Sequence, residues 1–362
     1  MQITRNTTSM AAGLSIATDK NGRDSCVIVV KGTFSVDSSG STRLADDQVP
    51  LAYTDEHYGD PSTTSMRYEC DFSPFKPRCD VLLNGAAYAP GGRPAKRVTV
   101  GLRVGSVNKS FEVVGDRVWR RRLWWTVPTR PAPFTRLPIT YDLAFGGVDG
   151  SSRRPEQVRT YAENPVGRGY YPLTKRGSLI GKHLQNIEPV GLRIRKFSRE
   201  IPPISFGPMS RNFSARIRYA GTYDEQWKKE RFPFLPDDFD DRYFQAAPVD
   251  QQSPFLKGGE AVSCTNLTPE GHFAFAVPRV RVPVVCKFAD RQARPAANLD
   301  TLIIEPDERR CILVWRASVP LGRKLHALRQ VLVGHPLRSR SSKPHFRSIR
   351  ELVEWKRQRG LR

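Results

Sequence analysis

The sequence contains no run of 18 consecutive apolar residues, which is about the length that a helix needs to cross a lipid bilayer. Its first residues, MQITRN, lack the basic and then apolar pattern of a secretory signal. We therefore expect a cytoplasmic protein with no membrane partner.

Cysteine is scarce and scattered. The chain has six cysteines, none in a C-x-x-C pair, and the closest two are Cys70 and Cys79. The six histidines show no metal-ligand spacing, and no Asp-rich calcium loop occurs. We expect reduced, mostly buried thiols, no metal site and no cofactor.

Motifs of catalysis are also missing. There is no G-x-S-x-G, H-E-x-x-H or G-x-x-x-x-G-K-[ST] pattern, which argues against an enzyme. One alternative stays open, a hydrolase that uses central carboxylates for acid and base work. Its candidate residues are Asp142, Glu163, Glu188 and Asp224.

Acidic residues are few beside basic ones, with 36 Asp and Glu against 58 Lys and Arg in 362 residues. The net charge of +22 suggests an acidic or polyanionic partner. Residues 321–362 hold 12 basic and 2 acidic residues, a net charge of +10. A disordered arm, a segment ordered by a partner and a nucleic-acid patch all remain open for this tail.

Short apolar runs between turn residues predict a mainly β fold. We expect a β-sandwich-like N-terminal part over residues 1–135, a loop-rich β part over 136–320 and a short basic helical tail over 321–362. The expected strands are 26–30, 80–83, 98–104, 111–114, 273–277, 280–288, 301–305 and 311–317. Residues 305–310 predict a hairpin loop between the last two strands.

Two short helices are expected in the tail. Leu321, Leu325, Leu328 and Leu332 fall on one helical face before Gly334 and Pro336. The second helix follows the capping-box pattern SIRE at residues 348–351.

The segment WRRRLWW, residues 119–125, interleaves aromatic and cationic side chains and holds three of the six tryptophans. Such a surface can stack bases and neutralise phosphates, and it also has the composition of protein interface hot spots. The simpler interpretation is a loop whose indoles cover the sheet core. The candidate contact residues for a partner are Arg121, Arg122, Trp124 and Trp125.

The order of short motifs is more informative than any one of them. KPRCDVLLNG at 76–85 and VVGDRVW at 113–119 are followed by a central series. The series reads YDLAFGG at 141–147, ENPVGRGY at 163–170, NIE at 186–188, FGP at 206–208, GTYDEQW at 221–227, LPDDFD at 235–240, APVDQ at 247–251 and GGE at 258–260. Over residues 10–320, this order resembles the bacterial domain of unknown function family 2169 (DUF2169).

The resemblance implies a non-enzymatic adaptor or chaperone of a type VI secretion system. Such a protein holds an effector, or its PAAR-linked region, and helps to load it on the VgrG-type spike. Second and third hypotheses are a nucleic-acid or polyanion binder and the hydrolase above. If the first is right, we expect a platform of loops built by Asn164, Asn186, Glu188, Asp224, Trp227, Arg231, Asp240 and Arg242.

Overall fold

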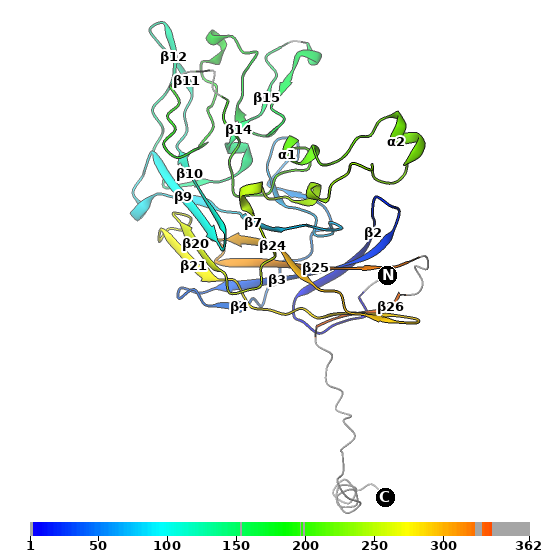
Figure 1. Cartoon of the computed structure of the whole chain (residues 1–362). Coiled ribbons are helices and arrows are strands. Elements are labelled where there is room, and N and C mark those ends of the chain that lie inside the picture. Colours follow the sequence, from blue (N-terminus) through cyan, green and yellow to red (C-terminus); the bar gives the residue numbers. More distant parts are fainter. Residues whose placement is uncertain (1–2, 153, 196, 198–199, 323–327, 335–362) are drawn as a thin grey trace, which may run out of the picture.

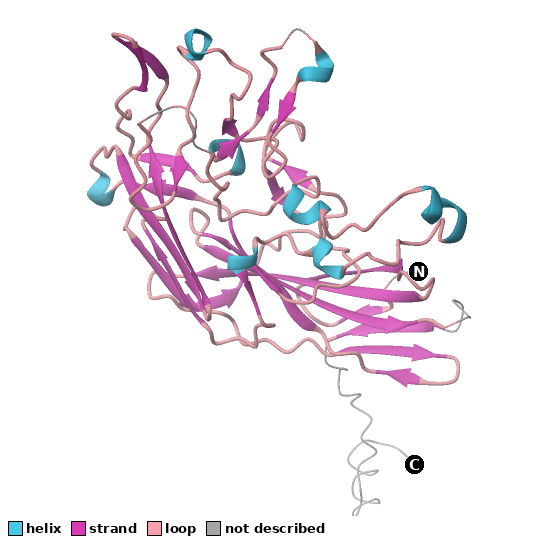
Figure 2. Cartoon of the chain, turned by 45° about the horizontal axis from the view of Figure 1, so that its top comes forward, coloured by secondary structure: helices cyan, strands magenta, loops and turns pink. Residues whose placement is uncertain are grey.

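The structure is a computed structural model that describes residues 3–152, 154–195, 197, 200–322 and 328–334 (Figure 1). As predicted, the fold is mainly β. Figure 2 shows the short helices set within the loops and the long strands gathered below them. Within the described residues, no helix is both long enough and apolar enough to cross a membrane.

The largest sheet has the order β19-β7-β24-β25-β3-β2, with β4 paired to β3. Its pairs are antiparallel except β24 with β7, which are parallel. The strands are β19 (Gln252–Ser253), β7 (Cys79–Leu83), β24 (Asn298–Glu305), β25 (Arg310–Pro320), β3 (Asp24–Val36), β2 (Ala11–Thr18) and β4 (Thr42–Leu44). The central strands β3 and β25 are buried on both faces, which explains their continuous apolar runs.

A second sheet has the order β18-β10-β9-β20-β21. In β9, buried residues alternate with more exposed ones, as expected for a strand with one face on a core. The strands are β18 (Ile187–Glu188), β10 (Val107–Val114), β9 (Arg97–Val104), β20 (Ala261–Thr265) and β21 (His272–Ala276). Ile28 and Leu313 of the first sheet share one hydrophobic core with Leu102 and Phe111 of the second.

A third sheet joins the two ends of the described chain in the order β1-β26-β22-β23. Its strands are β1 (Arg5–Asn6), β26 (Leu328–Val333), β22 (Val284–Phe288) and β23 (Gln292–Ala293). The remaining described strands form pairs. They are β5 (Glu56–His57) with β6 (Met66–Tyr68), β8 (Ala86–Tyr88) with β13 (Arg136–Pro138), β11 (Trp119–Arg122) with β12 (Trp125–Pro128), β14 (Phe145–Gly146) with β17 (Arg168–Gly169), and β15 (Val148–Asp149) with β16 (Arg159–Thr160).

Helical elements in the described residues are short. They are α1 (Ser214–Ile217), α2 (Glu225–Glu230) and the 3-10 turns η1 (Pro90–Gly92), η2 (Tyr141–Leu143), η3 (Pro155–Gln157), η4 (Arg176–Leu179), η5 (Asp241–Phe244) and η6 (Val249–Gln251). From residue 141 to 253, every described strand is two residues long. This stretch is therefore loop-rich, as the sequence predicts.

Two expectations about elements are wrong. Residues 328–333 form strand β26, not part of a helix, because they pair with β22 on one side and β1 on the other. The predicted strand 280–288 begins only at Val284, directly after Pro283, whose missing N–H cannot join a ladder. The helix expected after residue 348 lies outside the described residues.

The other strand predictions are confirmed, although β3 continues to Val36, six residues beyond its predicted end. Glu305 faces Arg310 across the predicted hairpin. All six cysteines are free, and all but the half-buried Cys70 are buried, also as predicted. Burial is the largest cause that raises the pKa of the Cys264 thiol to about 12, so it stays protonated and unreactive at neutral pH.

Candidate partner-binding site

Strands β11 and β12 form a two-stranded hairpin at the edge of the loop-rich part (Figure 1). Leu123 turns the chain with a φ of 52°, in the left-handed region. At the tip, Leu123 is 80% exposed, Trp124 89% and Trp125 67%. Three consecutive large apolar side chains therefore stand in solvent, where they lose the free energy that burial would give them.

The base of this hairpin is anchored by its first residue. Trp119 is buried with Leu179 and Leu184, and the ring of Phe197 stands edge-on to its indole at 5.6 Å. The expectation that the indoles cover the sheet core is therefore wrong for Trp124 and Trp125, which the turn at Leu123 carries into solvent. Trp119 is buried as expected, but in a small cluster separate from the core that the two sheets share.

The arginines of the hairpin are free to meet a partner. Arg121 and Arg122 are exposed, and no hydrogen bond or ion pair within the described residues uses their side chains. Arginine beside exposed tryptophan is the combination enriched at interface hot spots. The structure thus places all four predicted contact residues together on one protruding element.

Asn164 lies at the centre of the loops. It is fully buried, and its Nδ2 donates to the carbonyl oxygens of Tyr141 at 2.8 Å and Phe145 at 3.0 Å. Gly167 packs directly on this amide. A Cβ added at Gly167 would overlap with Asn164 Nδ2 and would also lie only 2.8 Å from Ala144 O. The motifs at 141–147 and 163–170 therefore meet at this amide.

Asn186 and Glu188 link the loops to the second sheet. Asn186 Nδ2 donates to Val114 O and to Asp116 Oδ1, both at 2.9 Å, and its Oδ1 accepts from Arg168. Glu188 is fully buried between Arg117 at 2.5 Å and Arg97 at 3.0 Å. Asn186 therefore fixes the backbone at Val114, and Glu188 balances the charges of two arginines.

The remaining predicted platform residues lie around α2. Asp224 caps that helix by accepting from the N–H of Trp227 at 2.8 Å, and the Trp227 indole donates to Phe234 O at 2.9 Å. Arg231 donates to Lys20 O and lies 3.1 Å from Asp237.

Asp240 caps η5 and pairs with Arg242 at 2.6 Å, while the Arg242 guanidinium lies over the Tyr219 ring at 4.3 Å. This second group of predicted residues lies in a different part of the chain from Asn164.

The four carboxylates of the hydrolase hypothesis have separate surroundings. Asp142 accepts from the Ser65 hydroxyl at 2.5 Å, and the exposed Glu163 accepts from Tyr161 at 3.2 Å. Glu188 and Asp224 have the structural partners given above. Within the described residues, no contact joins any two of the four, and no three His, Cys, Asp or Glu side chains are grouped to hold a metal ion.

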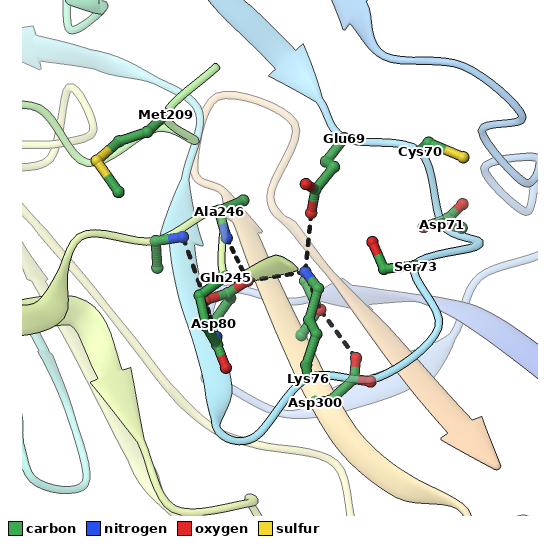
Figure 3. A network of polar contacts seen from close by, with 12 residues as sticks. Glu69, Cys70, Asp71, Ser73, Lys76, Asp80, Met209, Gln245, Ala246 and Asp300 are labelled. Carbon is green, nitrogen blue, oxygen red and sulfur yellow. Dashed lines mark hydrogen bonds and ion pairs between the residues drawn. The ribbon is translucent and has the colours of Figure 1, made fainter. Parts of the chain in front are cut away.

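Sequence reasoning missed a buried network of charges beneath the loops (Figure 3). Lys76 reaches Asp80 at 2.7 Å and Glu69 at 3.0 Å. Asp80 also accepts from the backbone N–H groups of Ala246 and Ala247 at 2.9 and 3.1 Å. One signal was available in the sequence, because Asp80 stands inside the apolar strand CDVLL.

The network continues through cations from distant parts of the chain. Arg216 lies 2.5 Å from Glu69 and donates to the backbone oxygens of Met209 and Tyr243. Arg316 pairs with Asp300 at 2.6 Å, and Lys31 pairs with Asp71 at 2.9 Å. Four buried cations thus balance four buried carboxylates, as the low dielectric of an interior demands.

The pKa of Glu69 reflects these contacts. Burial works to raise it, but Lys76, Arg216 and Arg211 outweigh burial and lower the pKa of this carboxyl to about 2. Burial also acts to lower the pKa of Lys76, and Asp80 and Glu69 raise it above its usual value. Both groups are therefore charged at neutral pH.

Comparison with known proteins gives a family. The family described as "Uncharacterized protein conserved in bacteria (DUF2169)" matches residues 21–316. No curated protein and no solved structure matches the chain. The match spans most of the chain, including the Asn164 loops, the charge network and the hairpin, so the protein belongs to the DUF2169 family.

Proposed function

We propose that the protein is a non-enzymatic adaptor or chaperone of a bacterial type VI secretion system, acting in the cytoplasm. It binds an effector, or the PAAR-linked region of one, and assists its loading on a VgrG-type spike. The observation that carries the proposal is the hairpin tip, where Leu123, Trp124 and Trp125 are exposed beside unpaired arginines.

The exposed side chains at the hairpin tip can supply binding energy to a partner. Burying two indoles against a partner removes a large apolar area from water, and arginine adds hydrogen bonds at the rim. The hairpin is fixed at its base by Trp119, so little order has to be gained when a partner binds. The separate surroundings of the candidate carboxylates also support a binding role over catalysis.

Co-purification with the proteins encoded by the neighbouring genes tests the proposal. Replacing both Trp124 and Trp125 by alanine should weaken partner binding by about 30-fold or more, since truncating even one hot-spot residue costs about 2 kcal/mol or more. The fold should be unaffected, because both side chains stand in solvent.

Tyr53→Ala is the matched control, since Tyr53 is an exposed aromatic side chain on another part of the chain. It should leave partner binding unchanged. Wild-type protein that retains no neighbouring gene product, or a double variant that retains it fully, would overturn the proposal.

The unpaired arginines favour a second candidate, a nucleic-acid or polyanion binder. This role requires that affinity for DNA or RNA fall steeply as salt rises. Charge reversal at Arg121 and Arg122 to glutamate should then reduce binding to a labelled oligonucleotide. Undetectable or salt-independent binding removes this candidate.

A further inference from the structure

A cavity of about 600 Å³, lined mostly by polar and charged residues, opens among the motif loops. Asn84 comes from the segment after β7, Thr140 and Asp142 come from the start of η2, and Arg168 comes from β17. Three motif stretches that are far apart in the sequence thus contribute to its walls.

Two buried polar atoms in this wall have no hydrogen-bond partner among the described residues. They are Asn84 Oδ1 and Thr140 Oγ1, on residues that are only 7% and 8% exposed. Buried polar groups in folded proteins are almost always bonded, and an unbonded one is costly. Asn84 Oδ1 can only accept, and the Thr140 hydroxyl can accept as well as donate, so a donor group would satisfy both atoms.

The charges around the cavity are also unbalanced. Five carboxylates line it against three guanidinium groups. The carboxylates are Asp116, Asp142, Glu305, Asp307 and Glu308. Arg310 adds a fourth cation from outside the wall, since it lies 2.6 Å from Glu305. In a protein with a net charge of +22, the wall still has more carboxylates than cations.

The three guanidinium groups of the wall already have acidic neighbours. Arg136 pairs with Asp307 at 2.6 Å, Arg67 lies 3.7 Å from Glu305, and Arg168 lies 3.6 Å from Asp116. By contrast, Asp142 uses one oxygen for Ser65, and no described residue donates to the other. Asp142 therefore has a free carboxylate oxygen in the same cavity wall as the two unpartnered oxygens of Asn84 and Thr140.

We propose that the cavity binds the cationic side chain, arginine or lysine, of an extended segment of the partner protein. The guanidinium or ammonium group donates to Asp142, Asn84 and Thr140. The Nε atoms of Arg67 and Arg168 are likewise buried without acceptors. The main-chain carbonyl oxygens on either side of the partner's cationic residue accept from these two atoms. The inference rests on the proposed function in assigning this side chain to a partner.

Small probes test the site without any partner. N-acetyl-arginine amide carries the cation and two carbonyls, and N-acetyl-citrulline amide has a nearly identical shape without the charge. We expect the arginine probe to bind at least about tenfold more tightly in ligand-observed NMR titrations, since hydrogen bonds between charged groups exceed neutral ones.

Two substitutions locate the binding. Asp142→Asn should weaken the arginine probe about tenfold, and Thr140→Val about threefold, because each removes one acceptor. Thr140→Val should leave the melting temperature unchanged or higher, since it removes an unsatisfied buried hydroxyl. Ser73→Ala is the control, because Ser73 has another buried, unpartnered hydroxyl outside the cavity, and it should leave probe affinity unchanged.

Equal affinity for the two probes, or wild-type affinity in both cavity variants, overturns the inference. These results are independent of the hairpin variants. A failed probe titration would leave the adaptor proposal standing, and a failed co-purification would leave a cation site without a known partner.

Discussion

Asn164 and Gly167 show how single residues fix the loop-rich part. The amide of Asn164 serves two backbone carbonyls from a position sealed from water, and Gly167 leaves the space for it. Asn164 cannot turn away from a new side chain without leaving both carbonyls unbonded, which is costly in a buried site.

Gly167→Ala should therefore lower the free energy of unfolding by about 1–3 kcal/mol, the usual cost of overpacking. Urea unfolding followed by fluorescence measures this change. Gly101→Ala is the control, because the nearest atom to a Cβ there is Thr265 Cβ at 3.7 Å, an ordinary contact. Equal stability of the two variants would contradict the steric argument.

The sequence predicts what some single residues do, but not which partners they contact. A glycine-rich run with Asn164 indicates tied loops, since glycine and asparagine are typical of turns. The partners of that amide cannot be predicted, because Tyr141 and Phe145 lie about 20 residues away and reach it only through the fold. Likewise, Trp119, Trp124 and Trp125 lie in one short segment of aromatic and basic residues. Only the turn at Leu123 separates the buried Trp119 from the exposed Trp124 and Trp125.

At the scale of elements, strands with strong alternation or continuous apolar runs were predictable, as β3, β9 and β25 show. Strand β26 was not. Its leucines at 328 and 332 suit a helix as well as a strand, and pairing decides between them. That pairing involves β1, more than 300 residues away, so no local pattern contains it.

The Lys76 contacts bind strand β7 to the segment around Glu69. Lys76→Met should lower the free energy of unfolding by about 3–5 kcal/mol, because Glu69 and Asp80 would each lose a cation in a buried site. Urea unfolding at pH 7 provides the measurement.

Lys228→Met is the control for this element-scale prediction. Lys228 lies 2.5 Å from Glu225 on the exposed surface of α2, and surface ion pairs contribute about 0–1 kcal/mol. A Lys76→Met variant no less stable than Lys228→Met would show that the ion pairs of Lys76 make no net contribution to the free energy of unfolding.

At the scale of the whole molecule, the buried charge network makes stability depend on pH. The pKa of Glu69 lies below its unfolded value of 4.5, at about 2, so the folded state favours the charged carboxylate. This contribution is fully present above about pH 4.5, and it is lost as the pH falls through about 2. Its size is about 3 kcal/mol.

Unfolding free energies measured from pH 7 to pH 2 test this dependence. Glu69→Gln should be less stable at pH 7, but its stability should fall by about 3 kcal/mol less than that of the wild type between pH 4.5 and pH 2. Glu225→Gln, on the exposed side of α2, should follow the wild-type curve. Parallel curves for Glu69→Gln and wild type would refute the assignment.

The pairing of early with late strands in the first and third sheets has a consequence for how the chain folds during its synthesis. Strand β1 is synthesised first, but its partner β26 begins at Leu328, and the central strands β24 and β25 emerge only after residue 298. At about 5–20 residues per second, the ribosome needs at least about 15 s to reach Asn298. During this interval β3 can pair only with β2 and β4, and β7 only with the two-residue strand β19. The edges of β3 and β7 that β25 and β24 later occupy therefore stay open until the last part of translation.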